Sequence, residues 1–258
     1  MFWLHEEDLP AGVGSEPFCA MHLIYIAVFL VLTVCYARLY KKMDPGRRKT
    51  AGRILGAAVF FFGLCEYGVS AIIGHFDLYS LPLHLCSLMF FLIPVHAWIE
   101  PKRAGSFAGR LHSFLGAVVF FPGIPGTWAA LLFPDWLNYP FWNYLSISGF
   151  MAHGLVSVYG ASVLVNIAES PDRRKLFRNN LLKSVLFLAV GAAVMLFFDR
   201  ATGTNYWFMA GPGAGSPFTD IYARGGYSAY LFAYSLTAAA VAAVWYGIRY
   251  CFLVFRRK

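Results

Sequence analysis

The chain has 258 residues, of which 59% are hydrophobic and only 13% are charged. A soluble domain would be about half apolar and about a quarter charged, so this composition excludes an ordinary soluble protein. Apolar runs of about 20 residues recur along the chain, which is the length that spans a hydrocarbon core of ~30 Å. The sequence therefore predicts an all-α polytopic membrane protein, with one integral membrane domain (residues 1–258) formed by a bundle of about seven transmembrane helices.

The net charge of +8 is distributed unevenly between the two ends of these runs. Of the 21 basic residues, 19 fall on one side, and only Arg200 and Arg224 fall on the other. The 19 are Arg38, Lys41, Lys42, Arg47, Arg48, Lys49, Arg53, Lys102, Arg103, Arg110, Arg173, Arg174, Lys175, Arg178, Lys183, Arg249, Arg256, Arg257 and Lys258. Basic loops favour the cytoplasm, so we expect a multi-pass protein of the cell membrane with its amino terminus outside and its carboxyl terminus cytoplasmic. Anionic lipids account for the basic loops, and no nucleic-acid partner is expected.

The amino-terminal segment is acidic, which suits the outer side, and it lacks the basic start of a cleaved signal peptide. Its acidic residues are Glu6, Glu7, Asp8 and Glu16. The five cysteines form no CxxC pair and no zinc-type spacing, so neither a disulfide framework, nor a metal site, nor a cofactor is expected. Cys19 lies near the outer surface, whereas Cys35, Cys65, Cys86 and Cys251 fall within apolar runs.

The first two spans differ in their polar content. The first, about Ala20 to Tyr40, resembles a lipid-facing anchor, and we expect its His22 to be solvated at the outer interface. The second, about Arg53 to Gly74, carries Glu66, the one carboxylate deep within a run. A carboxylate inside a membrane either helps helices to pack or takes part in proton chemistry, so both interpretations of Glu66 stay open.

The third span, Leu81 to Trp98, opens with the stretch LPLHLCSL and places an imidazole and a thiol at membrane depth. Ionisable side chains there are costly, so they indicate a functional site. With Ser80 as N-cap and a helix from Leu81, Cys86 lies about 8 Å along the helix, beyond the reach of the helix dipole. His84 and Cys86 then point to different faces, so a base for Cys86 must come from another span.

The fourth and fifth spans carry further features of a pocket. The fourth begins near Arg110 and meets Pro-Gly-Ile-Pro-Gly at residues 122–126, where a broken helix is expected to form one wall of a pocket. The fifth follows Trp136 and Trp142, whose indoles suit the outer interface. A polar stripe that should face inward consists of Asn143, Ser146, His153 and Ser157. His153 is expected roughly 15–20 Å deep, below Cys86.

The last third of the chain contains two spans and a long polar segment. A cytoplasmic loop over Asn166–Arg178, with a turn at residues 170–172, precedes the sixth span, Leu181 to Phe198. The seventh span runs from about Tyr227 to Val254. Between them, Asp199 to Gly226 is the longest non-apolar segment, which is typical of a lid or a binding loop.

Three stretches resemble the YwaF-type bacterial family of integral membrane proteins. They are LPLHLCSL at residues 81–88, the polar fifth span around His153, and DRATGTNYWFM at residues 199–209 followed by a segment rich in Gly, Pro and Ser. That family is distantly similar to an animal transmembrane protein that acts as a cysteine-dependent acyltransferase on ether phospholipids. The resemblance implies that Cys86 is an acyl-accepting nucleophile and that His153 is its base.

The hypothesis that follows is a lipid acyltransferase or acyl hydrolase with an outward-facing polar pocket and phospholipid acyl chains as substrate. Glu66 or His84 would orient the histidine, while Ser146 and Asp199 would support the pocket. Asn205, Tyr206 or amides freed at the break in the fourth span would donate to an oxyanion. Two alternatives stay open. A proton-coupled small-solute transporter would use Glu66, His84 and His153 as a proton relay and bind its solute at the broken fourth helix. A non-catalytic scaffold or sensor would use the same polar groups as packing.

Overall fold

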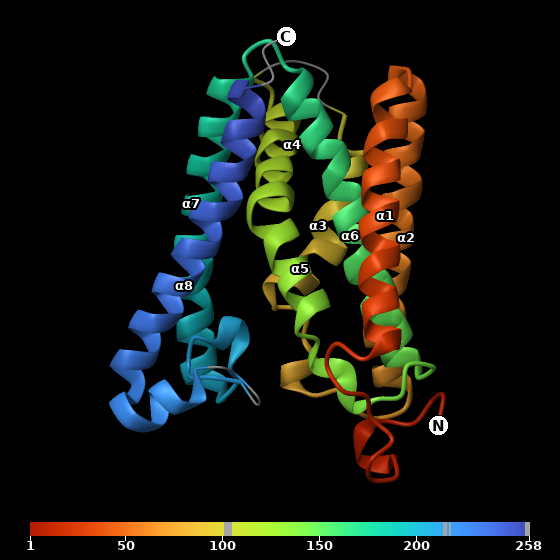
Figure 1. The fold of residues 1–258 in the computed structure, drawn as a ribbon, viewed down its shortest axis with the longest axis vertical. Helices are drawn as coiled ribbons and strands as arrows, with labels where there is room; N and C mark the ends of the chain where they lie inside the picture. Colours follow the sequence, from red (N-terminus) through yellow and green to blue (C-terminus); the bar gives the residue numbers. More distant parts are fainter. Residues whose placement is uncertain (101–104, 214–215, 217, 256–258) are drawn as a thin grey trace. The chain divides into compact units, whose positions relative to one another are not determined.

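The computed structural model describes residues 1–100, 105–213, 216 and 218–255, and every element within those ranges is helical (Figure 1). The helices are α1 (Ala20–Lys42), α2 (Pro45–Ile72), α3 (Leu85–Trp98), α4 (Phe107–Val118), α5 (Ile124–Leu132), α6 (Tyr144–Glu169), α7 (Arg173–Thr202) and α8 (Thr219–Phe255). Short helical turns are η1 (Glu6–Asp8), η2 (Leu78–Ser80), η3 (Val119–Gly123), η4 (Asp135–Asn138) and η5 (Tyr206–Phe208). Lys102, Arg103, Arg256, Arg257 and Lys258, with the side chains of Arg249 and Cys251, lie outside the described residues.

The predicted multi-pass helical membrane protein is confirmed. Within the described residues, six helical segments are long and apolar enough to cross a membrane, namely α1, α2, the run Phe107–Asn138, α6, α7 and Thr219–Gly247. The seventh apolar helix, α3, has 14 residues, so it is about 21 Å long and shorter than the ~30 Å hydrocarbon core.

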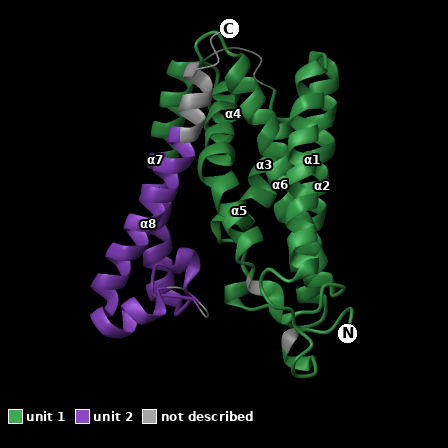
Figure 2. Ribbon diagram, in the orientation of Figure 1, with its two compact units in different colours: residues 1–184 green, residues 185–258 purple. Residues whose placement is uncertain are grey.

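The chain forms two compact units, residues 1–184 and residues 185–258 (Figure 2). The prediction of one membrane domain therefore stays a prediction, and the two units are described separately.

In the first unit, α6 is the central helix, and α1, α2, α3 and α5 pack against it. Its buried residues lie on all sides, and the predicted polar stripe is confirmed as inward, since Asn143, Ser146, His153 and Ser157 are at most 2% exposed. Small residues permit this close packing: a Cβ on Gly154 would lie 2.2 Å from the ring of Phe29 in α1. A helix buried on every side is well placed to hold polar groups away from lipid.

His22 is buried, not solvated as predicted. Its Nδ1 accepts from the Phe18 N–H at 2.8 Å, and its Nε2 donates to the Leu131 carbonyl at 2.7 Å. The side chain has no exposed surface and so joins α1 to α5. Most of α1 is exposed, as the prediction of a lipid-facing anchor requires, and His22 lies on the minority face that contacts the bundle.

The fourth span stays helical where a break was predicted. Residues Val119–Gly123 form a wide π turn between α4 and α5, in which the Ile124 N–H donates to the Val119 carbonyl. Pro125 stands in the first turn of α5, where its missing N–H costs little. The irregular backbone is buried, and Gly123 and Gly126 lie against Met89 and Leu85 of α3. The segment therefore lines α3, but as a continuous helix.

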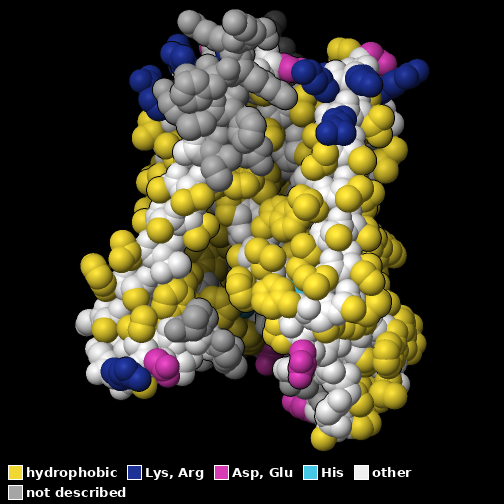
Figure 3. Space-filling model, viewed as in Figure 1, with side chains coloured by type: hydrophobic (Ala, Val, Ile, Leu, Met, Phe, Trp, Pro, Cys, Tyr) yellow, Lys and Arg dark blue, Asp and Glu magenta, His cyan; other side chains and the backbone are white. Residues whose placement is uncertain are grey.

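Lys and Arg side chains gather where α1 meets α2, and Asp and Glu gather at the opposite, N-terminal end of this unit (Figure 3). Several of these basic residues form ion pairs with glutamates. Arg48 makes a two-pronged contact with Glu169, at 2.6 and 3.2 Å, and Lys49 and Arg53 both contact Glu100. Lys49, by hydrogen bond and charge, and Arg53 together hold the pKa of Glu100 below its usual range.

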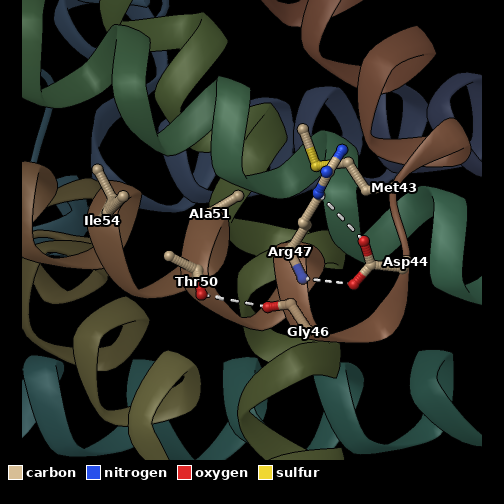
Figure 4. Close-up of a pocket in the computed structure, with 7 residues that line it drawn as sticks. All are labelled: Met43, Asp44, Gly46, Arg47, Thr50, Ala51 and Ile54. Carbon is tan, nitrogen blue, oxygen red and sulfur yellow. Dashed lines mark hydrogen bonds and ion pairs between the residues drawn. The ribbon is translucent and has the colours of Figure 1, made fainter.

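An open depression lies at the same end, lined by Met43, Asp44, Gly46, Arg47, Thr50, Ala51 and Ile54 (Figure 4). Asp44 caps α2, because its carboxylate accepts from the Arg47 N–H at 3.0 Å, and it also pairs with the Arg47 guanidinium. Residues 44–46 therefore form the start of α2, with Asp44 as its N-cap. The polar groups of this depression are engaged in capping, so we assign it no function.

Two boundaries in the last third differ from expectation. The predicted loop Asn166–Arg178 contracts to the turn at residues 170–172, because α6 continues to Glu169 and α7 begins at Arg173. The helix α8 begins at Thr219, but Gly226 has φ +68° and ψ −169°, so the regular helix resumes at Tyr227 as predicted.

Candidate functional site

The helix that carries Cys86 begins at Leu85, four residues later than predicted. Leu81 precedes Pro82 and is extended, with φ −63° and ψ 142°, as residues before proline prefer. Ser80 does not cap this helix. It closes the turn η2 with Asp77, whose carboxylate accepts from both the hydroxyl and the N–H of Ser80, and these bonds lower the pKa of Asp77.

Cys86 is therefore the second residue of α3 and lies in its first turn. The first bond of the helical ladder runs from the Leu88 N–H to the His84 carbonyl at 2.9 Å, so the amides of residues 85–87 precede it. The positive end of the helix dipole acts within this turn, contrary to the prediction that the dipole would have little effect. The thiol is half-buried.

His84 also changes its role, because it occupies the N-cap position and is not part of the helix. Its backbone is extended, with φ −60° and ψ 147°, and its ring contacts Tyr79 edge-on at 5.3 Å between centroids. The prediction that His84 and Cys86 point to different faces assumed that both were helical, and this assumption was wrong. Helix geometry therefore no longer excludes His84 as a partner of Cys86.

His153 lies ten residues into α6 and is 2% exposed. Its Nδ1 is 2.7 Å from the carbonyl oxygen of Gly149. A carbonyl only accepts, so Nδ1 carries the proton, and in the neutral ring Nε2 is the nitrogen with the lone pair. The backbone thus fixes the tautomer that a general base at Nε2 requires.

Two aromatic rings hold the imidazole. Phe90 of α3 meets it edge-on at 5.2 Å, and Trp136 of η4 lies over it at 4.8 Å. Phe90 follows Cys86 by four residues, so both lie on one face of α3, about 6 Å apart along the axis. The face of α3 that carries Cys86 is therefore turned toward His153, with the imidazole about one turn deeper. Their direct pairing stays a prediction.

Glu66 lies on the face of α2 that is turned toward the start of α6. Ser70, one turn further along α2, joins the two helices by donating to the Glu66 carbonyl at 2.9 Å and bonding to the hydroxyl of Tyr144, the first residue of α6, at 3.2 Å. Ser146, 1% exposed, donates to the Trp136 carbonyl at 3.4 Å. Glu66 thus belongs to a helix that packs against α6, and Ser146 belongs to α6 itself, as His153 does. The predicted roles of Glu66 and Ser146 stay predictions.

The other three candidates belong to the second unit, where Asp199, near the end of α7, bonds to the loop that carries Asn205 and Tyr206. Asp199, 2% exposed, accepts at Oδ1 from the Thr204 hydroxyl and from the Tyr206 N–H, at 2.9 and 2.8 Å. Asn205 bridges the loop to Gly211 and Ala210, and Tyr206 is fully buried. The tyrosines of α8 donate to carbonyls of the same loop, through Tyr227, Tyr230 and Tyr234. In this unit, the three candidates order the loop.

Sequence reasoning missed the role of Trp136, which was predicted at the outer interface. Its indole packs on His153 and Phe150, and a Cβ on Gly149 would lie 3.0 Å from it. It also missed a second buried cluster, in which His96 shares a 2.7 Å hydrogen bond with the Tyr159 hydroxyl and stacks on His112 at 4.1 Å. The i to i+4 spacing of Gly149 and His153 was the available signal for the Trp136 contact, since a glycine one turn away leaves room for a ring.

Comparison with known proteins gives one match. The sequence model of the TMEM164 family matches residues 15–246, a range that includes both Cys86 and His153. No curated protein and no solved structure matches the chain. The predicted YwaF-type assignment stays a prediction.

Proposed function

Because the chain belongs to the TMEM164 family, we propose that it is a membrane-embedded lipid acyltransferase or acyl hydrolase, with Cys86 as nucleophile and His153 as base. Family membership supports acyl transfer as the activity class. The observation that carries the assignment to Cys86 is its position as the second residue of α3.

The start of a helix is a favourable place for a nucleophilic thiol. Amide N–H groups and the positive end of the dipole stabilise negative charge in the first turn, first on the sulfur and then on the oxygen of the tetrahedral intermediate. A thiol in the middle of an apolar helix lacks this support. Cys86 is also half-buried, so a lipid ester has access to it.

In the proposed reaction, His153 Nε2 takes the thiol proton and the sulfur of Cys86 attacks the carbonyl carbon of a phospholipid ester. The C–S bond forms, the C–O bond breaks, and the leaving alcohol takes the proton from His153. A second alcohol then attacks the thioester, gives its proton to His153 and releases Cys86. Water in place of that alcohol makes the protein a hydrolase.

The substrate follows from the surroundings of the pair. Membrane phospholipids are the esters at this depth, and the inward faces beside the pair are aromatic, with Phe90 and Trp136 against His153. The hydrogen bond to the Gly149 carbonyl keeps the proton of His153 on Nδ1, so Nε2 carries the lone pair that base catalysis requires. A transporter based on a discontinuous fourth helix loses its structural basis, because that helix is continuous through residues 119–132.

The test uses the purified full chain reconstituted in vesicles with a phospholipid donor and a lysophospholipid acceptor. Lipid mass spectrometry measures transfer, and intact-protein mass spectrometry measures the acyl group on Cys86. We expect Cys86→Ala to abolish both signals. His153→Ala is expected to slow acylation by about 10²–10⁴-fold, the usual contribution of a general base.

Cys65→Ala is the matched control, because Cys65 is also half-buried but lies in the middle of α2. It should acylate and transfer as the wild type does. Equal activity of the wild type and Cys86→Ala, with both folded, would show that the proposal is wrong. Activity that depends on Cys86 but not on His153 would remove the histidine from the mechanism and leave His84 as the next candidate.

A further inference from the structure

Three metal-ligating side chains meet at the N-terminal end of the first unit, apart from the Cys86 region. They are His5, Glu7 and His75, and one ligand atom from each lies within 4.8 Å of the other two. His5 and Glu7 belong to the amino-terminal segment, whereas His75 follows α2 in the connection that leads to α3. Seventy residues of sequence separate the two histidines, so no ligand spacing could reveal them.

The two histidine rings lie against each other, and one of their ring nitrogens lacks a hydrogen-bond partner among the described residues. The rings of His5 and His75 stack at 4.2 Å with 7° between their planes. The Nδ1 of His5 is buried and has no hydrogen-bond partner among the described residues. A buried ring nitrogen without a partner is costly, and a bound cation would satisfy it.

One carboxylate oxygen lies near each ring nitrogen of His75. Its Nδ1 is 3.9 Å from Glu7 Oε2, and its Nε2 is 3.5 Å from Asp8 Oδ2. A metal-bound histidine commonly donates its second N–H to a carboxylate, which fixes the ring and raises its basicity. Asp8 is placed for that role if Nδ1 of His75 and Glu7 bind the ion.

The amino-terminal segment is held in place independently of this cluster. Asn143 donates to the carbonyls of Met1 and Leu4, both at 2.9 Å, and the Tyr144 N–H donates to the Phe2 carbonyl at 3.0 Å. The following turn closes through the Asp8 N–H and the His5 carbonyl at 3.0 Å. These bonds present His5, Glu7 and Asp8 together to His75, so little chain entropy remains to be lost on binding.

We propose that His5, Glu7 and His75 bind a divalent transition-metal ion, with Zn²⁺ as the preferred ion and Asp8 as the carboxylate that orients His75. Two imidazoles and one carboxylate are a zinc ligand set, with water as the fourth ligand. Coordination requires the stacked rings to rotate apart, which their partial exposure permits. The ion fastens the amino-terminal segment to the connection that leads to Cys86. The site stands independently of acyl transfer.

The test titrates Zn²⁺ into the purified, metal-free full chain and measures binding by calorimetry. We expect one Zn²⁺ per wild-type chain and loss of that binding in His5→Ala and in His75→Ala. Asp8→Asn should weaken it by about 10–100-fold, as second-shell changes do. Glu7→Gln should weaken binding strongly, whereas Glu16→Gln, an exposed glutamate of the same segment, should match the wild type.

A second readout protects the test against misfolding. Zn²⁺ should raise the melting temperature of the wild type and of Glu16→Gln, and it should not do so in His5→Ala or Glu7→Gln, because only a ligand that binds the folded state stabilises it. His5 and Glu7 lie in the amino-terminal segment outside the helical core, so these variants are expected to fold even if His75→Ala does not. Equal Zn²⁺ affinity in wild type, His5→Ala and Glu7→Gln would overturn the proposal.

Discussion

At the scale of single residues, the position of the His153 ring depends on a glycine in a different helix. A Cβ on Gly63 of α2 would lie 2.8–2.9 Å from three atoms of Phe90, and Phe90 is the residue that meets His153 edge-on. Gly63→Ala must therefore displace Phe90. We expect it to reduce acyl transfer and to destabilise the fold by about 1–3 kcal/mol, as overpacking does.

Gly68→Ala is the matched control, because it lies in the same helix and nothing stands within 4 Å of its Cβ position. It should leave transfer unchanged and raise stability by up to ~1 kcal/mol, through the higher helix propensity of alanine. Thermal melting and the transfer assay measure the two effects. If Gly63→Ala behaves as Gly68→Ala does, Phe90 does not position His153.

At the scale of helices, Arg48 joins three elements near the basic end of the first unit. Its guanidinium donates to the carbonyls of Tyr40, Lys41 and Met43 at the end of α1, and it holds Glu169 of α6 through two bonds. The side chain is 21% exposed, so solvent screens these contacts only in part. We expect Arg48→Ala to lower the free energy of unfolding by on the order of 2 kcal/mol, because several charge-assisted bonds are lost.

Arg47→Ala tests whether charge alone explains the effect. The side chain of Arg47 is 82% exposed, and among the described residues it pairs only with Asp44 on its own turn, so its removal should change stability by at most ~0.5 kcal/mol. Arg48→Lys should recover little, since an ammonium cannot reproduce the two-pronged contact. Equal melting temperatures for Arg47→Ala and Arg48→Ala would contradict the role assigned to Arg48.

The helices themselves were largely predictable, since long apolar runs leave few alternatives, and the exceptions have local causes. The start of α3 moved because Pro82 disfavours a helical Leu81, whereas the prediction gave more weight to Ser80 as N-cap. The run at residues 122–126 stayed helical because the backbone widens into a π turn, which accommodates prolines that cannot donate an N–H to the helix. In both places two local signals compete, and a single sequence does not show which of them prevails.

The candidate site was less accessible to sequence reasoning than the fold. A polar stripe identified His153 and its inward direction, but the rings that hold it come from α3 and η4, distant in the chain. Asn205 and Tyr206 were predicted as oxyanion donors and Asp199 as a support of the pocket, and the structure shows the bonds by which these three residues order the loop at residues 203–211. Periodicity indicates which side chains face inward, but it does not identify the residues they meet.

At the scale of the whole molecule, the distribution of charge predicts which end of the first unit faces the cell exterior. Lys and Arg gather where α1 meets α2, and the N-terminal end carries acidic residues (Figure 3). Basic segments are retained in the cytoplasm, so the N-terminal end, with the proposed metal site, should face outward.

Two introduced cysteines test this orientation in a chain that carries Cys19→Ser. Glu16→Cys and Arg47→Cys both alter exposed positions, at opposite ends of α1. A membrane-impermeant maleimide added to intact cells should label the Glu16→Cys variant at once. It should label the Arg47→Cys variant only after permeabilisation, and the Cys19→Ser chain supplies the background from the remaining cysteines. The reverse pattern would place the amino terminus in the cytoplasm, and the metal site would then meet cytoplasmic zinc, not zinc from outside the cell.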